Sequence, residues 1–547
     1  MVVARATGTA PPAWWPWCVL AIALLAGALR VAYVLTLRST PWFDQLVVDP
    51  EFYDAWATRI AAGDWMGARP FYMDPLYPYL LAGLYRLVGR DLLLARLLNV
   101  ALSAAACALV ARLGRLLGGW RVGALAALGF AVYAPEIFYV GEVEKTTLSV
   151  LLTSACLVLW LGASLAARFG AGVALGLAAL TRANLLLFAP LCVLLCLWPR
   201  AEWRARVGGL PRAPLHALLF AAGCLLALAP VAWRNHHLSG EWVLTTAQAG
   251  QNFYIGNNPY NPSGAYGVLP FVRANPHFEE GDFRAEAERR AGAPLTAAEV
   301  SRFWFAEAFR FMREQPAEAT GVMLRKAALF WNDFEVSDNQ DQYLMERDSW
   351  VLRLPLLGFG LLAPLAVLGA LAGWRGNHAV RLLGGFVLIY WATVVGFFIY
   401  SRYRIQVVPA LLALGGLGVV TLVERVRAGD WARVAGGAAV AVVVGWFCLH
   451  SIDIFSQDNE QVVEMRLRHL ADAYFQAGQP ERAVAALYEA IDACPVRCRG
   501  AFDDLVGAYL RDGQLRPVEA LLRQFVHRQP HNAEAAGALE MLHAASP

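Results

Sequence analysis

The chain has 547 residues, of which 58% are hydrophobic and only 16% are charged, and its formal net charge is +3. This composition excludes an ordinary water-soluble protein. Many apolar runs reach the ~20 residues that a helix needs to cross a bilayer.

Apolar runs predict about eleven membrane spans, so the expected fold class is an all-α polytopic transmembrane bundle. The first run is too long for a signal peptide and contains Arg30, so we expect a retained span. The predicted spans are residues 14–37, 92–112, 120–134, 146–167, 169–182, 184–198, 213–233, 351–373, 380–400, 405–424 and 433–452.

Arginine-rich short loops indicate which side faces the cytoplasm. With the N-terminus inside, the arginine clusters between spans fall on one side. Counting Pro75–Gly89 as a span would move the later clusters outside, so we expect it to be an amphipathic surface segment. The C-terminus is then outside.

Three long polar regions are therefore expected on the outer side, namely residues 38–91, residues 234–350 and the tail 453–547. Residues 1–452 form the predicted membrane domain. The inner loops are short and the chain has no Walker A motif, which argues against nucleotide hydrolysis. We expect no nucleic-acid partner.

The tail repeats itself with a period of 35 residues. Two helices per repeat, with Gly at the turn and Pro at the end, resemble tetratricopeptide repeats. Such repeats would either stabilise the membrane domain or bind a protein partner. The matching positions are Leu470 and Leu505, Ala473 and Ala508, Tyr474 and Tyr509, Gly478-Gln479 and Gly513-Gln514, Leu487 and Leu522, and Pro495 and Pro530.

Cys494 and Cys498 are the two of nine cysteines that lie in this polar tail. A disulfide between them is plausible if the tail faces an oxidising compartment. The other seven cysteines lie in apolar runs, where we expect them to be small packing residues.

The first outer loop carries two candidate catalytic carboxylates, Asp49 and Asp74. A carboxylate at an apolar surface suits a general base for a hydroxyl or an amine. Asp49 could equally be the N-cap of a short helix, with Pro50 at its first position.

The second outer turn brings Glu142, Glu144 and Lys145 to the edge of a span. Lys145 stands out because Lys326 is the only other lysine in an arginine-rich chain. These residues could share the carboxylate site, with Lys145 near a phosphate. They could instead extend to the interface and cap the next helix.

Arginines at outer span ends form the third candidate group. Arg402 and Arg404 lie between two spans, and Arg234 ends another. Their guanidinium groups suit a phosphate or a pyrophosphate, or else lipid headgroups. Asn252 and Tyr254, in the segment Gln251–Pro259, suit sugar hydroxyls and rings, or an ordinary turn.

Together these segments resemble the membrane glycosyltransferases of the GT-C fold, in the family 39 branch of protein O-mannosyltransferases and the lipid A aminoarabinose transferase. The resemblance covers most of residues 14–452. Its pieces are the first loop with Asp49, PLYPYLLAGLYRLVG from Pro75, ARLLNVALSAAACALVARLGRLLG, GLAALTRANLLLFAPL, NFYIGNNP, and RYRIQVVPALLALGG from Arg402.

The resemblance implies a polyprenyl-phosphate sugar donor and inverting transfer to a protein or lipid acceptor. Transfer would occur at the outer face of the bacterial inner membrane. Asp49 would be the base, and Arg402 and Arg404 would stabilise the phosphate that departs. Lipid A relatives carry Glu-Lys-Pro-Pro-Leu where this chain has Tyr72-Met73-Asp74-Pro75-Leu76, so the family Glu falls on Tyr72 and Asp74 lies two positions later. The family contains both sites that use a divalent metal and metal-free sites.

Three rivals remain. The nearest is another lipid-linked transferase with the same fold, such as an oligosaccharide or lipid-modifying enzyme, and the other two come from other functional classes. A transporter or flippase predicts ionisable residues at mid-bilayer and symmetry between halves. A non-catalytic scaffold displaying the repeats would leave the acidic first loop unexplained.

Overall fold

The computed structural model describes residues 11–197, 213–267, 269–273, 275–450, 460–494 and parts of 501–540. The chain forms two compact units, one of residues 1–36 and 46–450 and the other of residues 37–45 and 451–547. Within the described ranges the secondary structure is helical, and β-pairing is limited to two isolated bridges. The all-α prediction is confirmed.

Among the described residues of the larger unit, six helices are long and apolar enough to cross a membrane: α2 (Trp15–Leu37), α5 (Leu92–Gly118), α12 (Ala213–Ser239), α19 (His378–Gly396), the continuous segment Ser401–Arg427 that ends in α21, and α22 (Trp431–Leu449). Five shorter apolar helices accompany them: α6 (Trp120–Ala131), α8 (Thr146–Leu161), α9 (Leu165–Ala179), η2 with α10 (Ala183–Leu197), and α18 (Phe359–Gly373). All eleven coincide with the predicted runs, so the protein is a multi-pass membrane protein.

Pro75–Gly89 forms the short helix α4 (Leu76–Val88), which is not among the helices that could span a membrane. One face of α4 buries Tyr77 and Leu81 against α3 (Asp49–Ala61), with the Tyr53 and Tyr77 rings 6.1 Å apart. Leu87 on the other face is 84% exposed. This one-sided burial fits the predicted amphipathic segment.

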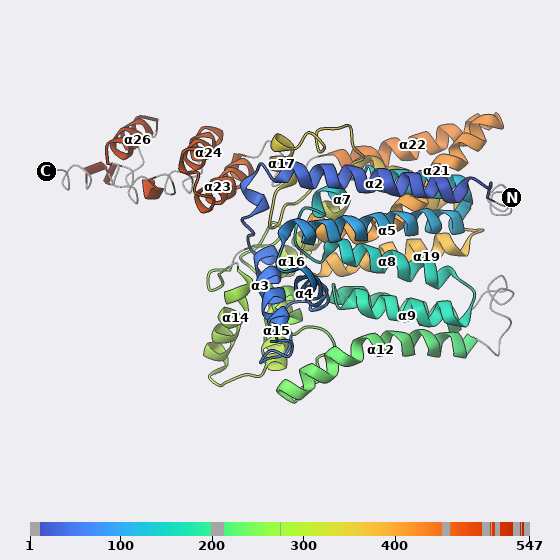
Figure 1. Cartoon of the computed structure of the whole chain (residues 1–547), viewed down its shortest axis with the longest axis horizontal. Coiled ribbons are helices and arrows are strands. Elements are labelled where there is room, and N and C mark those ends of the chain that lie inside the picture. The colour runs from blue at the N-terminus through green and yellow to red at the C-terminus, as the bar shows by residue number, and fades with distance from the viewer. Residues whose placement is uncertain are drawn as a thin grey trace. The chain divides into compact units, whose positions relative to one another are not determined.

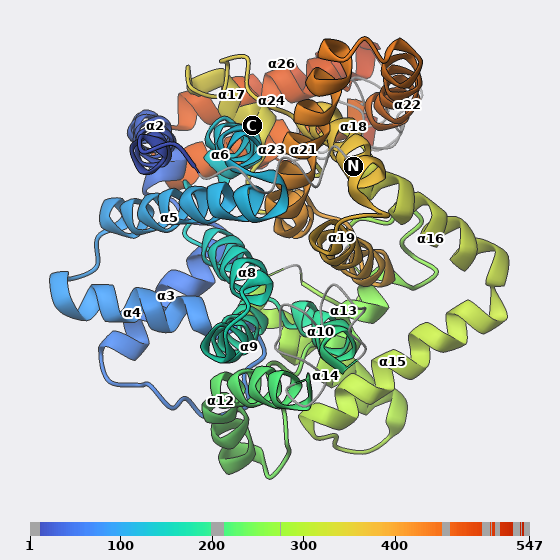
Figure 2. The same cartoon turned by 90° about the vertical axis from the view of Figure 1, so that its right-hand side faces the viewer.

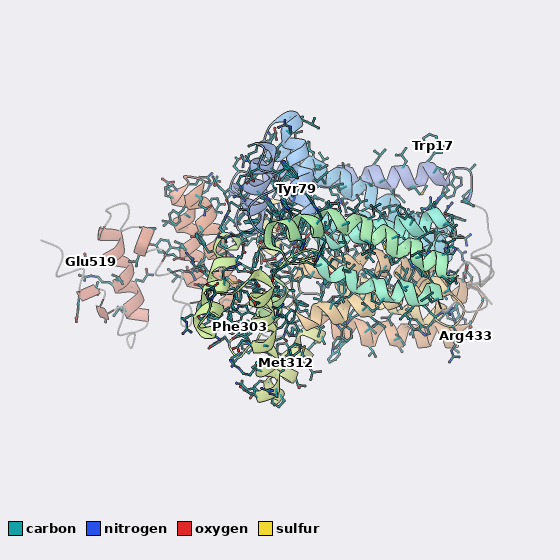
Figure 3. All side chains as sticks on the ribbon, turned by 90° about the horizontal axis from the view of Figure 1, so that it is seen from below. Trp17, Tyr79, Phe303, Met312, Arg433 and Glu519 are labelled. Carbon is teal, nitrogen blue, oxygen red and sulfur yellow. The ribbon has the colours of Figure 1, made fainter. Side chains whose placement is uncertain are left out.

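Figure 1 shows α2, α5, α8, α9 and α12 side by side, with α3, α4, α14 (Pro276–Ala291) and α15 (Ala297–Glu314) gathered at one end. Figure 2 shows α8 and α9 between α3 and α4 on one side and α15 and α16 (Pro316–Trp331) on the other. In Figure 3, Tyr79 and Phe303 lie toward that end, and Trp17 and Arg433 lie at the opposite end.

Glycines bring the backbones of α9 and α12 together. A Cβ atom added at Gly172 would clash with the Phe220 carbonyl oxygen, and one at Gly223 would clash with the Phe169 carbonyl oxygen. Small residues at a helix contact allow this approach, which supplies the packing energy that replaces the hydrophobic effect within lipid.

The smaller unit contains α23 (Glu460–Gln476), α24 (Pro480–Ala493), α26 (Leu515–Arg528) and the short helix η1 (Pro41–Phe43). α23 and α24 form a helical hairpin, and Gly478 between them has φ +69°, which favours glycine. Of the repeat positions, Ala473, Ala508, Leu487 and Leu522 are buried. This agrees with equivalent packing in the two repeats.

The remaining partners of the 35-residue repeat, Leu505, Tyr509, Gly513-Gln514, Pro495 and Pro530, lie outside the described residues. The tetratricopeptide assignment therefore stays a prediction. Cys494 takes part in a disulfide bond, and Cys498 also lies outside the described residues.

We expect Gly172→Ala to destabilise the membrane unit by about 1–3 kcal/mol, because the new methyl group would force α9 and α12 apart. Thermal unfolding in detergent measures the effect. Gly170→Ala is the matched control on the same helix, since its Cβ would meet only the Leu159 side chain at 3.4 Å. Equal stability of the two variants would contradict close packing at Gly172.

Candidate active site

A buried arginine stands where the chain passes between two spans. α19 ends at Gly396, and the four-residue helix α20 (Ser401–Arg404) then precedes α21 (Val408–Arg427). Arg402 lies on α20 and is 6% exposed. A guanidinium buried at this depth must be paired and hydrogen-bonded, because its desolvation is costly.

Three carboxylates from distant parts of the chain surround Arg402. Its Nη1 donates to Asp49 Oδ2 at 2.6 Å and to Glu144 Oε2 at 2.8 Å. Its Nε forms an ion pair with Asp338. These contacts join the first loop, the second outer turn and the end of the long loop in one cluster, which we call the Arg402 cluster.

Asp49 is the first residue of α3, and the N-cap position belongs to Val48. Capping therefore does not account for Asp49, and Pro50 is the second residue of the helix rather than the first. Val48 has φ +53°, the one positive value of a non-glycine residue in the described chain. A β-branched residue in this region is strained by about 1–3 kcal/mol, and the strain lies next to Asp49.

The turn that carries Glu142, Glu144 and Lys145 is fixed from α5. Arg96 Nε donates to the Gly141 carbonyl oxygen at 2.7 Å, and Asn99 Nδ2 donates to the Glu142 carbonyl oxygen at 2.8 Å. All three predicted residues are buried, so they do not extend to solvent. One oxygen of Glu144, Oε1, is buried without a hydrogen-bond partner.

Asp74 and Lys145 form a buried ion pair beside the cluster. The Lys145 ammonium group lies 5.6 Å from the centre of the Tyr53 ring. Tyr53 comes from α3, four residues after Asp49. The structure thus brings together five predicted residues, Asp49, Asp74, Glu144, Lys145 and Arg402.

Carboxyl groups outnumber cations here. Burial raises the pKa of Asp338 to about 7, and the charges of Asp49 and Glu144 add to the effect while Arg402 opposes it. Burial also raises the pKa of Glu142 well above its usual range, with the Glu144 charge next in importance. Glu142 Oε2 accepts a hydrogen bond from Asn339 Nδ2 at 3.4 Å. The site can therefore hold protons near neutral pH.

The arrangement does not fit a metal ion. In the part of the chain that the structure describes, no three His, Cys, Asp or Glu side chains are arranged as metal ligands. Between Asp49 and Glu144, where a divalent cation would bridge two carboxylates, Arg402 Nη1 already bridges them. We therefore derive no step through a metal.

Two residues of the site were not among the predicted ones. Asp338 lies in a polar segment rich in Asp, Asn and Gln, where no motif marks it. Arg182 follows α9, where its Nη2 donates to Thr146 Oγ1 at 3.0 Å and its guanidinium lies 4.7 Å from the centre of the Tyr403 ring. The sequence signal for Arg182 is its place in GLAALTRANLLLFAPL, one of the segments that resemble the GT-C fold.

Arg404 and Arg234 are placed elsewhere. Arg404 pairs with Glu335 at 2.6 Å, donates to the Phe330 carbonyl oxygen and covers the Phe359 ring. Arg234 lies 3.5 Å from the centre of the Phe71 ring and donates to the Met66 carbonyl oxygen at 2.8 Å. Both hold loop segments, and neither contacts the Arg402 cluster.

Asn252 and Tyr254 lie on α13 (Ala249–Gly256). Tyr254 is buried in the hydrophobic cluster of the long loop, 4.7 Å from Trp304 between ring centres. Asn252 is half-buried on the same helix. The structure does not bring this helix into the ion cluster.

No protein-family model matches the chain, and no curated protein matches it. Among solved structures, the chain is similar to the Archaeoglobus fulgidus oligosaccharyltransferase tethered with an acceptor peptide, with 13% identity over 86% of this chain and 59% of that chain and a TM-score of 0.45. It is also similar to ArnT from Cupriavidus metallidurans bound to undecaprenyl phosphate, with 15% identity over 94% of this chain and 80% of that chain and a TM-score of 0.42.

Both matched proteins are glycosyltransferases of the GT-C fold, the group that the quoted segments resemble. The chain spans 59% of the length of the oligosaccharyltransferase.

We expect the thermal stability of the membrane unit to fall as pH rises from about 5 to 7.5. The folded pKa of Asp338 is about 7 and its unfolded pKa is ~4, so between these values the folded state binds more protons and loses stability with rising pH. Asp338→Asn should reduce the fall in thermal stability with rising pH, and the fall that remains should come from Glu142. An unchanged pH slope in the variant would contradict the assignment to Asp338.

Proposed function

We propose that this protein is a membrane glycosyltransferase that moves a sugar from a polyprenyl-phosphate donor to a protein or lipid acceptor. The observation that carries the proposal is the Arg402 cluster. Asp49, Glu144 and Asp338 meet a buried arginine at the bundle end where the long loops gather. A membrane protein has little structural reason to bury so many carboxylates together.

Asp49 is the proposed general base. It would take a proton from the acceptor hydroxyl or amine, while the acceptor oxygen or nitrogen forms a bond to the anomeric carbon of the sugar. The bond between that carbon and the phosphate oxygen breaks, and the electron pair leaves with polyprenyl phosphate. Direct attack of this kind inverts the anomeric centre. The bond to Arg402 Nη1 at 2.6 Å would orient Asp49 for this step.

Arg402 and the Asp74–Lys145 pair are proposed to stabilise the reacting charges. The guanidinium of Arg402 offsets the negative charge that develops on the phosphate. Asp74 holds Lys145 beside Tyr53, next to Asp49 on α3. The leaving group is already a phosphate, so the reaction needs no nucleotide site.

The outer face of a bacterial inner membrane is the proposed location. The described arginines Arg115, Arg121, Arg375 and Arg433 lie in or next to loops at the end away from the cluster, as the positive-inside rule requires for a cytoplasmic face. The tail shares a unit with residues 37–45, which follow α2 directly. The disulfide of Cys494 fits an oxidising compartment on that side.

A transporter would require ionisable side chains that face a path near mid-bilayer. The buried Arg30 in α2 donates instead to the carbonyl oxygens of Phe130 and Ala131 and to Ser103. These contacts hold α2, α5 and α6 together. The concentration of carboxylates at one end favours surface chemistry over transport.

We expect Asp49→Asn to lower transfer activity by at least ~100-fold, because an amide cannot take the acceptor proton. The measurement is sugar transfer from defined polyprenyl-phosphate sugars by the purified protein, with thermal unfolding to verify the fold. Wild-type activity in the folded variant would remove Asp49 from the mechanism.

Glu51→Gln is the matched control for this experiment. Glu51 lies on the same helix two residues later, and its carboxylate pairs with His277 at 2.7 Å, away from Arg402. We expect its activity to remain within about twofold of wild type. A loss equal to that of Asp49→Asn would indicate a general sensitivity of α3 to charge loss.

The proposed sidedness predicts the reactivity of introduced cysteines. Ala62→Cys, just after α3, should react with a membrane-impermeant maleimide applied to the outer face of the inner membrane, and Ala428→Cys, just after α21, should not. Both positions are exposed. The free cysteines of the described chain are buried, except for the half-buried Cys18, so background should be low. The reverse pattern would refute the orientation.

A further inference from the structure

We propose that Arg182 is the anchor for the phosphate of the lipid-linked donor, an inference that rests on the proposed function. Arg182 lies in the bend between α9 and η2 and is 5% exposed. Its Nε atom is buried and has no hydrogen-bond partner among the residues that the structure describes. A buried guanidinium with an unused donor is a site for an anion.

The other two cations of the site are already compensated. Arg402 holds three carboxylates, and Lys145 holds Asp74. In the described part of the chain no carboxylate lies within ion-pair distance of Arg182; its guanidinium contacts the hydroxyl of Thr146 and the ring of Tyr403. An incoming phosphate would therefore have no protein carboxylate to displace at Arg182.

The position of Arg182 suits this role. Thr146 directly follows Lys145, and Tyr403 directly follows Arg402, so Arg182 touches the neighbours of both paired cations. The Leu76 amide donates to the Leu180 carbonyl oxygen at 3.2 Å, which ties the bend to the loop of Asp74. A phosphate on Arg182 would thus lie next to the proposed base and its supporting groups.

The segment after Arg182 offers a path for the isoprenoid chain. η2 and α10 run from Ala183, the residue after Arg182, to Leu197. Leu187 and Leu194, two helical turns apart, are exposed on this segment and would face lipid in a membrane. A donor could bind its phosphate at the bend while its tail stays along the apolar helix.

A guanidinium suits the donor phosphate better than an ammonium does, because its planar group can donate two parallel hydrogen bonds to the phosphate oxygens. The donor phosphodiester carries one negative charge, and the released polyprenyl phosphate carries nearly two. Arg182 would therefore bind the leaving group more strongly than the donor, and so favour cleavage of the anomeric bond.

The test is binding of undecaprenyl phosphate, its uncharged alcohol undecaprenol, and inorganic phosphate to the purified protein in detergent. We expect wild type to prefer the lipid phosphate over both other probes. Arg182→Gln should weaken lipid phosphate binding about tenfold or more and leave the alcohol within about twofold. The affinity of Arg182→Lys for the lipid phosphate should lie between those of wild type and Arg182→Gln, because lysine keeps the positive charge but cannot donate two parallel hydrogen bonds.

Arg86→Gln is the matched control, because it removes an exposed arginine of α4 that, among the described residues, donates only to the Ala61 carbonyl oxygen. Its lipid phosphate affinity should equal that of wild type. Thermal unfolding verifies each variant, and Arg182→Lys decides the question if Arg182→Gln does not fold.

The outcomes separate this inference from the proposed function. If wild type prefers the lipid phosphate and a folded Arg182 variant retains its full affinity, Arg182 is not the anchor and the proposed function stands. If wild type does not distinguish undecaprenyl phosphate from undecaprenol, the lipid-phosphate donor itself is refuted. If inorganic phosphate binds as tightly as the lipid and depends equally on Arg182, the site holds a free phosphate and the lipid assignment is overturned.

Discussion

The pairing of one buried arginine with three carboxylates constrains most of this structure. Burying Arg402 on α20 costs several kcal/mol of desolvation unless anions compensate it. Those anions come from residues 49, 144 and 338, so the first loop, the second turn and the long loop must all reach one point. Removing one partner of such a pair leaves a buried charge uncompensated, which typically costs about 3–5 kcal/mol. The fold and the candidate site therefore depend on the same contacts.

Neighbouring residues hold in place the segments that carry these carboxylates. Arg96 and Asn99 bind backbone carbonyls of the turn before Glu144, and Arg404 binds the segment that precedes Asp338. Val48 has a strained backbone conformation directly before Asp49, the first residue of α3, whose carboxylate binds Arg402. Strain of this kind persists only where the neighbouring contacts fix the backbone, as they do here.

The sequence predicted the spans well because lipid demands long apolar runs, whatever their neighbours. It placed helix ends less well: the predicted span 351–373 begins as helix only at Phe359, since residues 351–358 belong to the loop region. Asp49, Glu144, Lys145 and Arg402 stood out because charges at the edge of apolar runs are rare. Asp338 did not, because acids are ordinary in polar loops. Arg402 and Arg404 looked alike in sequence, yet two residues on a helix differ by about 200° in direction, so only one could face the carboxylates.

Several carboxylates surround Arg402, and their number affects the charge balance of the buried region during the proposed reaction. When Asp49 takes the acceptor proton it loses its charge, and a two-membered ion pair would then leave the arginine buried alone. Here Glu144 remains on Arg402, with Asp338 beside it, so the cation stays compensated throughout the step. In the same step the departing phosphate gains the negative charge that Asp49 gives up, and the total charge of the buried region does not change. A low-dielectric site penalises changes in net charge far more than internal transfers of charge. A cluster with surplus carboxylates can therefore pass a proton and release an anion without drawing water or counter-ions into the membrane boundary.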